Sequence, residues 1–144
     1  MTVESANLIV AVIALGSNIE PHSNITKAFA ELDKRFTFDK KAQLLHTKPV
    51  DVVGEQPDFI NTGCLLHTQL TQEELLAQLK QIEMQMGRKP MSSSEPRIID
   101  LDLVVWDGLI IDQDVYTRDF LQTIVIELLP DMENQISSKH SPKQ

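Results

Sequence analysis

Two aspartates, Asp100 and Asp102, stand one residue apart in the apolar stretch 96–106. After its first residue this stretch has no glycine or proline and is rich in β-branched and aliphatic residues, which predicts a buried β-strand. Because side chains alternate along a strand, both carboxylates are expected on one face, together with Trp106. Two acids in an apolar strand are costly unless a cation neutralises them, and divalent metal ions would do so.

Arginines gather around this strand. The chain carries a formal net charge of -8, yet three of its arginines fall between positions 88 and 118, namely Arg88, Arg97 and Arg118. Carboxylates, guanidinium groups and a polar loop in one place favour a magnesium–polyphosphate site. A structural alternative stays open, since an Asp-x-Asp pair can also lie on a sheet edge or form salt bridges.

Three further segments are predicted to form strands. Residues 7–15 are a continuous apolar run that stops at Gly16-Ser17-Asn18, which predicts a central strand followed by a turn. Residues 59–70 predict a second strand, and the more polar segment 38–45 predicts an edge strand. Residues 46–57 are expected to form a loop that is long enough to carry function.

Helices are predicted between these strands. One begins near Pro21, and a second is opened by a capping box of Thr71 and Glu74 and ends at Gly87. Glu83 on the second helix is expected to be solvated or paired along the helix. A short helix is predicted over residues 119–129.

The order of these elements is βαββαβ. It predicts a single ferredoxin-like α+β domain, in which helices pack on a mostly antiparallel sheet. Asp107-Gly108 predicts a hairpin after the aspartate-bearing strand. We expect the domain to span residues 1–132 and the polar tail 133–144 to be disordered. Since this fold hosts many functions, the function has to be inferred from the site residues.

Composition excludes several classes of partner. The negative net charge argues against non-specific binding to nucleic acid or to an anionic membrane. No run of about 18 apolar residues is present, so no transmembrane helix is expected. The single cysteine, Cys64, excludes an internal disulfide, suits a reducing compartment and is expected to be buried as a small apolar residue. We expect a cytoplasmic monomer.

Five short motifs follow one another along the chain. They are Ala14-Leu15-Gly16-Ser17-Asn18, Thr47-x-Pro49-Val50, Gln56-Pro57-Asp58-Phe59-Ile60-Asn61, Gly87-Arg88 and Pro96-Arg97-x-x-Asp100-Leu101-Asp102. As a co-linear set over residues 8–131, they resemble the hydroxymethyl-dihydropterin pyrophosphokinase family of folate biosynthesis. The resemblance implies a transferase that moves pyrophosphate from ATP to the hydroxymethyl group of 6-hydroxymethyl-7,8-dihydropterin and releases AMP. It also implies two Mg²⁺ ions.

The resemblance further implies roles for individual residues. Asp100 and Asp102 would hold both magnesium ions and, with Arg88 and Arg97, form the catalytic set. The nucleotide phosphates would be bound by three guanidinium groups, those of Arg88, Arg97 and Arg118. The pterin would be bound by hydrogen-bonding groups and by two stacking rings, from Thr47, Pro49, Val50, Phe59, Asn61 and Phe120.

The chain departs from the family pattern in three places. Members commonly carry Arg-Trp-Gly-Pro-Arg where this chain has Ser93-Ser94-Glu95-Pro96-Arg97, and a Val-Pro-His stretch where it has residues 112–117. Asp51 stands where glycine is usual. These departures motivate one alternative, a catalytically weak or inactive paralogue that binds pterin or nucleotide. A second is a regulatory or interaction module of the same fold.

Overall fold

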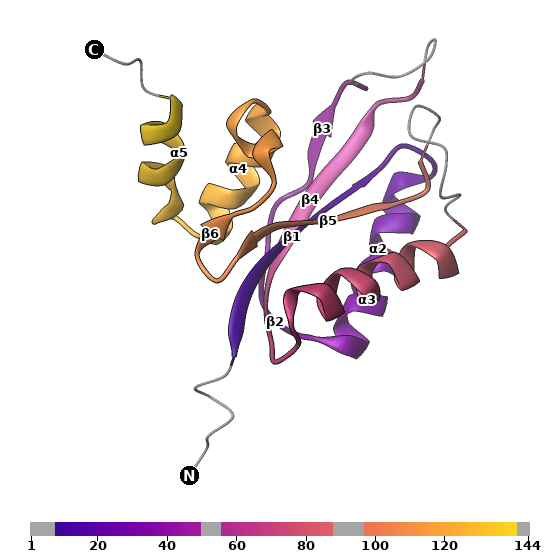
Figure 1. Cartoon of the computed structure of the whole chain (residues 1–144). Helices are drawn as coiled ribbons and strands as arrows, with labels where there is room; N and C mark the ends of the chain where they lie inside the picture. Colours follow the sequence, from indigo (N-terminus) through magenta and orange to yellow (C-terminus); the bar gives the residue numbers. More distant parts are fainter. Residues whose placement is uncertain (1–7, 50–55, 88–96, 141–144) are drawn as a thin grey trace.

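The computed structural model describes residues 8–49, 56–87 and 97–140. They form a six-stranded antiparallel sheet with helices on both faces (Figure 1). The strand order is β2-β4-β1-β5-β6, and β3 pairs with β4. The strands are β1 (Ile9–Ser17), β2 (Thr37–Lys41), β3 (Leu45–Thr47), β4 (Phe59–Thr68), β5 (Asp100–Trp106) and β6 (Leu109–Ile110).

The helices of the first face lie between the main strands in the chain. These are α2 (Pro21–Arg35) and α3 (Gln72–Gln85). Without the short strands β3 and β6, the order β1-α2-β2-β4-α3-β5 is βαββαβ, with β1 and β4 at the centre of the sheet. The predicted ferredoxin-like α+β fold is therefore confirmed.

Local signals placed α3 and the hairpin correctly. Thr71 accepts the backbone N–H of Glu74 at 3.1 Å, and the Glu74 carboxylate accepts the N–H of Thr71 at 2.8 Å. Gly87, just past the helix, has a φ of 96°, a backbone conformation that residues with a side chain rarely adopt. Asp107 and Gly108 join β5 to β6 with positive φ at both positions, as the predicted hairpin requires.

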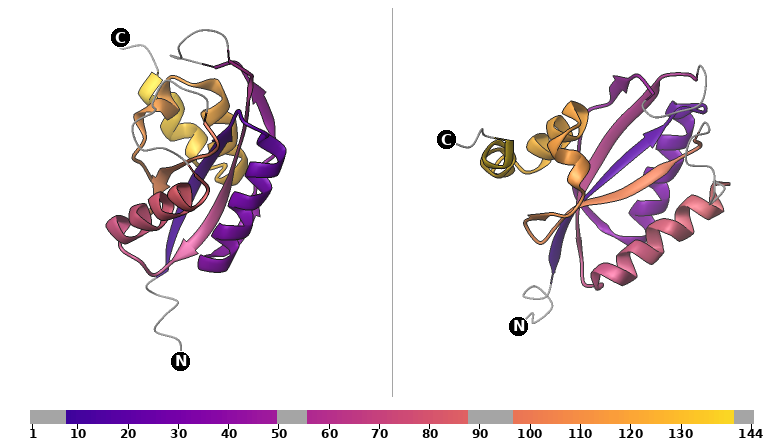
Figure 2. Two further views of the ribbon diagram at one scale, coloured as in Figure 1. Left: turned by 90° about the vertical axis from the view of Figure 1, so that its right-hand side faces the viewer. Right: turned by 45° about the horizontal axis from the view of Figure 1, so that its top comes forward.

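The second face is covered by the C-terminal elements (Figure 2). They are the 3₁₀-helix η1 (Gln113–Tyr116), α4 (Asp119–Leu128) and α5 (Met132–His140). The predicted disorder of the tail is wrong for residues 133–140, because α5 is helical and buries Met132 and Ile136 among the apolar side chains of this second face. One apolar residue per turn on a polar helix is a weak sequence signal. Residues 141–144 lie outside the described part of the chain.

Two more predictions need correction. Residues 45–47 form β3, so the strand predicted over 38–45 is split in two and the predicted loop 46–57 begins later. Trp106 packs on the α2–α3 face rather than on the face of the aspartates, because the β1–β5 register shifts between Val12 and Ile13. Such a bulge reverses side-chain alternation beyond it.

Cys64 is fully buried in the core, as predicted. Burial raises the pKa of its thiol to about 12, although the nearby Lys41 ammonium partly opposes the shift. The thiol therefore stays neutral at physiological pH.

Candidate active site

The site forms around the end of the central strand β1. In the sheet register, Gly16 of β1 lies opposite Asn61 of β4 on one side and opposite Asp100 of β5 on the other. Asn61 and Asp100, which are about 40 positions apart in the sequence, therefore lie on either side of Gly16 in the sheet. The sheet register alone explains why the motifs on β1, β4 and β5 meet.

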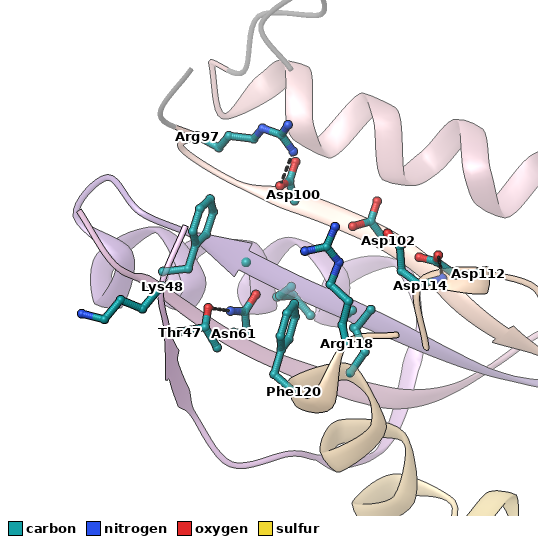
Figure 3. A pocket seen from close by; sticks show the side chains of 15 residues that line it. Thr47, Lys48, Asn61, Arg97, Asp100, Asp102, Asp112, Asp114, Arg118 and Phe120 are labelled. Atoms are coloured by element: carbon teal, nitrogen blue, oxygen red, sulfur yellow. Dashed lines mark hydrogen bonds and ion pairs between the residues drawn. The ribbon is translucent and has the colours of Figure 1, made fainter. Parts of the chain in front are cut away.

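A cavity of about 290 Å³ opens at this end of the sheet (Figure 3). Eight of the residues predicted to form a site line it: Thr47, Phe59, Asn61, Arg97, Asp100, Asp102, Arg118 and Phe120. The remaining lining residues are Ala14, Leu15, Gly16, Lys48, Asp112, Asp114 and Leu121. One end of the cavity presents the Asn61 amide and the rings of Phe59 and Phe120, and we call it the ring end. The other end presents the charged side chains of Arg97, Asp100, Asp102 and Arg118, and we call it the phosphate end.

Three predicted site residues are not among the described residues of the cavity wall. Arg88 and Val50 lie outside the described residues, so the structure gives no account of them. Pro49 follows Thr47 by two positions and is half-buried, but it is not among the described residues that line the cavity.

The ring end is organised by Asn61. Its side chain is only 8% exposed, and its amide N–H donates to the Thr47 hydroxyl at 2.6 Å. Figure 3 shows Asn61 and Thr47 joined by this bond. The bond orients the amide, and the amide carbonyl oxygen lies close to Gly16. Phe59 and Phe120 are both half-buried, so each ring keeps accessible surface. The arrangement offers a flat ligand hydrogen-bonding groups and apolar ring surface.

Gly16 provides the space that this amide occupies. A Cβ atom at Gly16 would come within 2.7 Å of the Asn61 Oδ1. We therefore expect Gly16→Ala to displace the Asn61 amide and to weaken affinity for the pterin that the family resemblance implies by about tenfold, since overpacking costs roughly 1–3 kcal/mol. Isothermal titration calorimetry with a hydroxymethylpterin would measure it. Unchanged affinity would contradict the expectation that a Cβ at Gly16 displaces an amide needed for binding.

The phosphate end is organised by β5. The side chains of Asp100 and Asp102 project from the same side of the strand into the cavity (Figure 3). The Arg97 guanidinium donates to the Asp100 carboxylate at 2.7 Å. Arg118 approaches from the other wall, at the N-terminus of α4, where its backbone N–H donates to Asp114 O at 2.9 Å. Figure 3 shows its guanidinium directed toward Asp102.

These aspartates fit a magnesium ion held jointly with a ligand. In the described part of the chain, no group of three or more His, Cys, Asp or Glu side chains is placed to hold a metal ion. Asp100 and Asp102 would therefore act with phosphate oxygens and water, which is the usual coordination of Mg²⁺ at nucleotide sites. Their hard oxygen donors suit that ion.

Three charged residues of the cavity were not predicted. Asp112 and Asp114 line the phosphate end, and Lys48 extends the wall next to Thr47. Asp112 also caps η1, because its carboxylate accepts the N–H of Asp114 at 3.0 Å. Asp112 and Asp114 form a second Asp-x-Asp pattern that is visible in the sequence. Only the fold shows that this pattern lies next to the first one, Asp100 and Asp102.

Glu83 of α3 supports β5 from outside the cavity. It is 4% exposed, and its carboxylate accepts the backbone N–H of Leu101 at 2.7 Å. The prediction of a solvated Glu83 is therefore wrong. Leu101 stands between the two aspartates, and its N–H lies at the edge of β5 that no described strand pairs with at this end. The Glu83 carboxylate thus accepts the Leu101 N–H, for which the sheet provides no acceptor.

Removal of this carboxylate should destabilise the fold. We expect Glu83→Ala to lower the free energy of unfolding by roughly 1–3 kcal/mol, because the Leu101 N–H loses its acceptor in a buried place. Urea denaturation would measure the loss. Glu83→Gln retains an acceptor oxygen and should lose less, and Met84→Ala, at a side chain that is 65% exposed, is the control. Equal stability of all four proteins would contradict this role.

Comparison with known proteins agrees with this geometry. Residues 12–130 match the family model described as 7,8-dihydro-6-hydroxymethylpterin-pyrophosphokinase. The chain belongs to this family. The pyrophosphokinase match extends from β1 to the end of α4 and so includes every described residue of the cavity.

Comparison with individual relatives agrees with this assignment. A 2-amino-4-hydroxy-6-hydroxymethyldihydropteridine pyrophosphokinase of Campylobacter jejuni is 38% identical over 65% of this chain and 61% of its own length. One of Haemophilus influenzae is 28% identical over 87% of this chain and 84% of its own length. A folic acid synthesis protein of Dictyostelium discoideum is 32% identical over 82% of this chain.

Several relatives are much longer than the pyrophosphokinase-like region. The match spans 19% of the Dictyostelium protein and 23% of a mitochondrial folate synthesis bifunctional protein of Arabidopsis thaliana.

Among the described residues of this chain, no helix is both long and apolar enough to cross a bilayer.

Proposed function

We propose that this chain transfers pyrophosphate from ATP to the hydroxymethyl group of 6-hydroxymethyl-7,8-dihydropterin and releases AMP, as a step of folate biosynthesis. One observation carries the proposal: a single cavity joins an amide and aromatic end to an end with aspartates and arginines. Two relatives named as pyrophosphokinases of this pterin support it. The buried, unpaired Cys64 fits a reducing compartment, and we propose a cytoplasmic monomer.

The ring end would hold the pterin. The Asn61 amide has one N–H engaged by Thr47, which leaves its carbonyl oxygen and its second N–H for the pyrimidine edge of the ring. Phe59 and Phe120 would contact the ring faces. Backbone groups of Pro49 and Val50 complete this set in our proposal, as the family resemblance implies.

The phosphate end would hold ATP. Arg97 and Arg118 would bind phosphate oxygens, together with Arg88, because a guanidinium presents paired donors to them. Arg97 is paired with Asp100 in the structure, so it would exchange a carboxylate for a phosphate when the nucleotide binds. Among the described residues, four carboxylates and three cationic side chains line the cavity, so a triphosphate needs accompanying cations.

Asp100 and Asp102 would hold Mg²⁺, two ions in our proposal, and when bound these ions supply charge neutralisation for the phosphates.

The pterin hydroxyl oxygen forms a bond to the β-phosphorus, and the bond from that phosphorus to the oxygen bridging to the α-phosphate breaks. AMP leaves with this oxygen, and the hydroxyl proton passes to solvent. We assign no residue as a dedicated general base, so the catalytic contribution is positioning and electrostatics.

A second candidate is a paralogue that binds these ligands without efficient transfer. It is favoured by Asp112 and Asp114, which add two carboxylates to the end that would receive the triphosphate. Like charges near phosphate oxygens weaken binding and oppose charge development.

An assay of AMP separates these candidates. The chain is incubated with ATP, Mg²⁺ and hydroxymethyl-dihydropterin, and AMP is measured with and without the pterin. Pterin-dependent AMP supports the transferase. Pterin binding without AMP identifies the paralogue. Neither binding nor AMP would leave an interaction module of the same fold.

A further inference from the structure

Asn18 is a polar side chain that is almost completely buried. It follows directly on β1 and is 2% exposed. A buried amide must have its hydrogen bonds satisfied, and those of Asn18 go to two distant segments of the chain. Its amide N–H groups donate to Gln56 Oε1 at 3.2 Å and to Pro57 O at 3.3 Å. Its carbonyl oxygen accepts the backbone N–H of Arg97 at 2.7 Å.

Each of these two segments leads into a different end of the cavity. Pro57 lies two positions before Phe59 and four before Asn61, which belong to the ring end. Arg97 itself belongs to the phosphate end and bonds to Asp100. The donor side of the Asn18 amide therefore contacts the segment leading to the ring end, and the acceptor side contacts the phosphate end.

The sheet shows why such a connection matters. β4 and β5 do not pair with each other, since both pair with β1. The last pairs at this end are Ser17 with Ile60 and Gly16 with Asp100, so Asn18 stands one position beyond the last pair with β4 and two positions beyond the last pair with β5. The backbone N–H of Asn18 also donates to Arg97 O at 3.1 Å. Among the described residues, Asn18 thus joins the two segments where strand pairing has ended.

We propose that Asn18 is a positioning residue that sets the ring end and the phosphate end at a fixed offset. The proposal rests on the function proposed above, because that offset would place the pterin hydroxyl against the β-phosphate. Asparagine suits the task since it carries donors and an acceptor in one planar group. Aspartate would keep the acceptor for Arg97 but lose both donors.

This difference between the two side chains provides the test. We expect Asn18→Asp to weaken binding of a hydroxymethylpterin by about tenfold, while affinity for a magnesium complex of a non-hydrolysable ATP analogue changes less than about twofold. Asn18→Ala should weaken the binding of both ligands. It should also lower kcat at saturating substrates by about 10²-fold, because a misplacement of the reacting groups by about 1 Å can have that effect. Calorimetry and the AMP assay give these quantities.

Asn24→Ala is the matched control. The Asn24 amide donates to Ile19 O at 2.6 Å, five residues earlier in the chain, and among the described residues it has no hydrogen bond to either segment, so both affinities and kcat should stay within about twofold. Equal weakening of both ligands by Asn18→Asp would overturn the proposal. So would an Asn18→Ala protein with native affinities and kcat.

A separate measurement keeps the inference distinct from the proposed function. If the native chain binds neither ligand, the proposed function fails, and amide hydrogen exchange still tests the role of Asn18. The Arg97 N–H should then exchange at least about tenfold faster in Asn18→Ala than in the native chain, but not in Asn18→Asp. Equal exchange in all three proteins would overturn the inference.

Discussion

Asp102→Ala is expected to lower pterin-dependent release of AMP by about 10³-fold at saturating substrates. Asp102 lines the phosphate end and would supply one of two carboxylates for magnesium, so its loss removes charge neutralisation where the phosphates react. Its side chain is exposed to the cavity, so the substitution should change the free energy of unfolding by less than about 0.5 kcal/mol. The AMP assay and urea denaturation of the same preparation measure both quantities.

Asp33→Ala is the control for this variant. Asp33 is an exposed aspartate on α2 and does not line the cavity, so activity and stability should both be native. Asp102→Asn retains the size of the side chain and should be nearly as inactive as the alanine variant, because the charge is what matters. An Asp102→Ala protein with more than about a tenth of native activity would contradict a magnesium role for this carboxylate.

The second large effect is expected at the ring end. Asn61→Ala should weaken pterin binding by roughly 1–3 kcal/mol, or about 5–150-fold, because polar groups of the bound ring lose their partner in a buried place. The Thr47 hydroxyl also loses the N–H that it accepts at 2.6 Å. Calorimetric titration with a hydroxymethylpterin would measure the change.

Affinity for the nucleotide should separate this effect from a general loss of structure. Asn61 lies at the end of the cavity away from Arg118 and the aspartates, so binding of a magnesium–nucleotide complex should change less than about twofold (Figure 3). Asn134→Ala, at an exposed position of α5, is a matched control. Native pterin affinity in the Asn61→Ala protein would remove this residue from the proposed pterin site.

Local signals in the sequence were sufficient for much of the fold. The capping box at Thr71, the glycine after α3 and the Asp107-Gly108 turn each depend on a few neighbouring residues, and each was predicted correctly. The spacing of Asp100 and Asp102 was sufficient to place both carboxylates on one side of β5. Signals of this kind depend on backbone geometry that is set within one element.

Features that depend on pairing between distant segments could not be predicted. β3 exists because residues 45–47 pair with β4, and Trp106 changes face because of a register shift with β1. The burial of Glu83 depends on the unpaired edge of β5, which a helical pattern does not reveal. The facing position of Asp112 and Asp114 likewise depends on how η1 folds back over the sheet.

The most direct test of the central claim identifies the products of the reaction. Phosphorus NMR of the chain with ATP, Mg²⁺ and hydroxymethyl-dihydropterin should show AMP and a pterin diphosphate appearing in equal amounts. Such a spectrum would show that the terminal two phosphates of ATP are transferred together to the pterin, as proposed here. The appearance of ADP with a pterin monophosphate, or of phosphate released without pterin, would contradict the account.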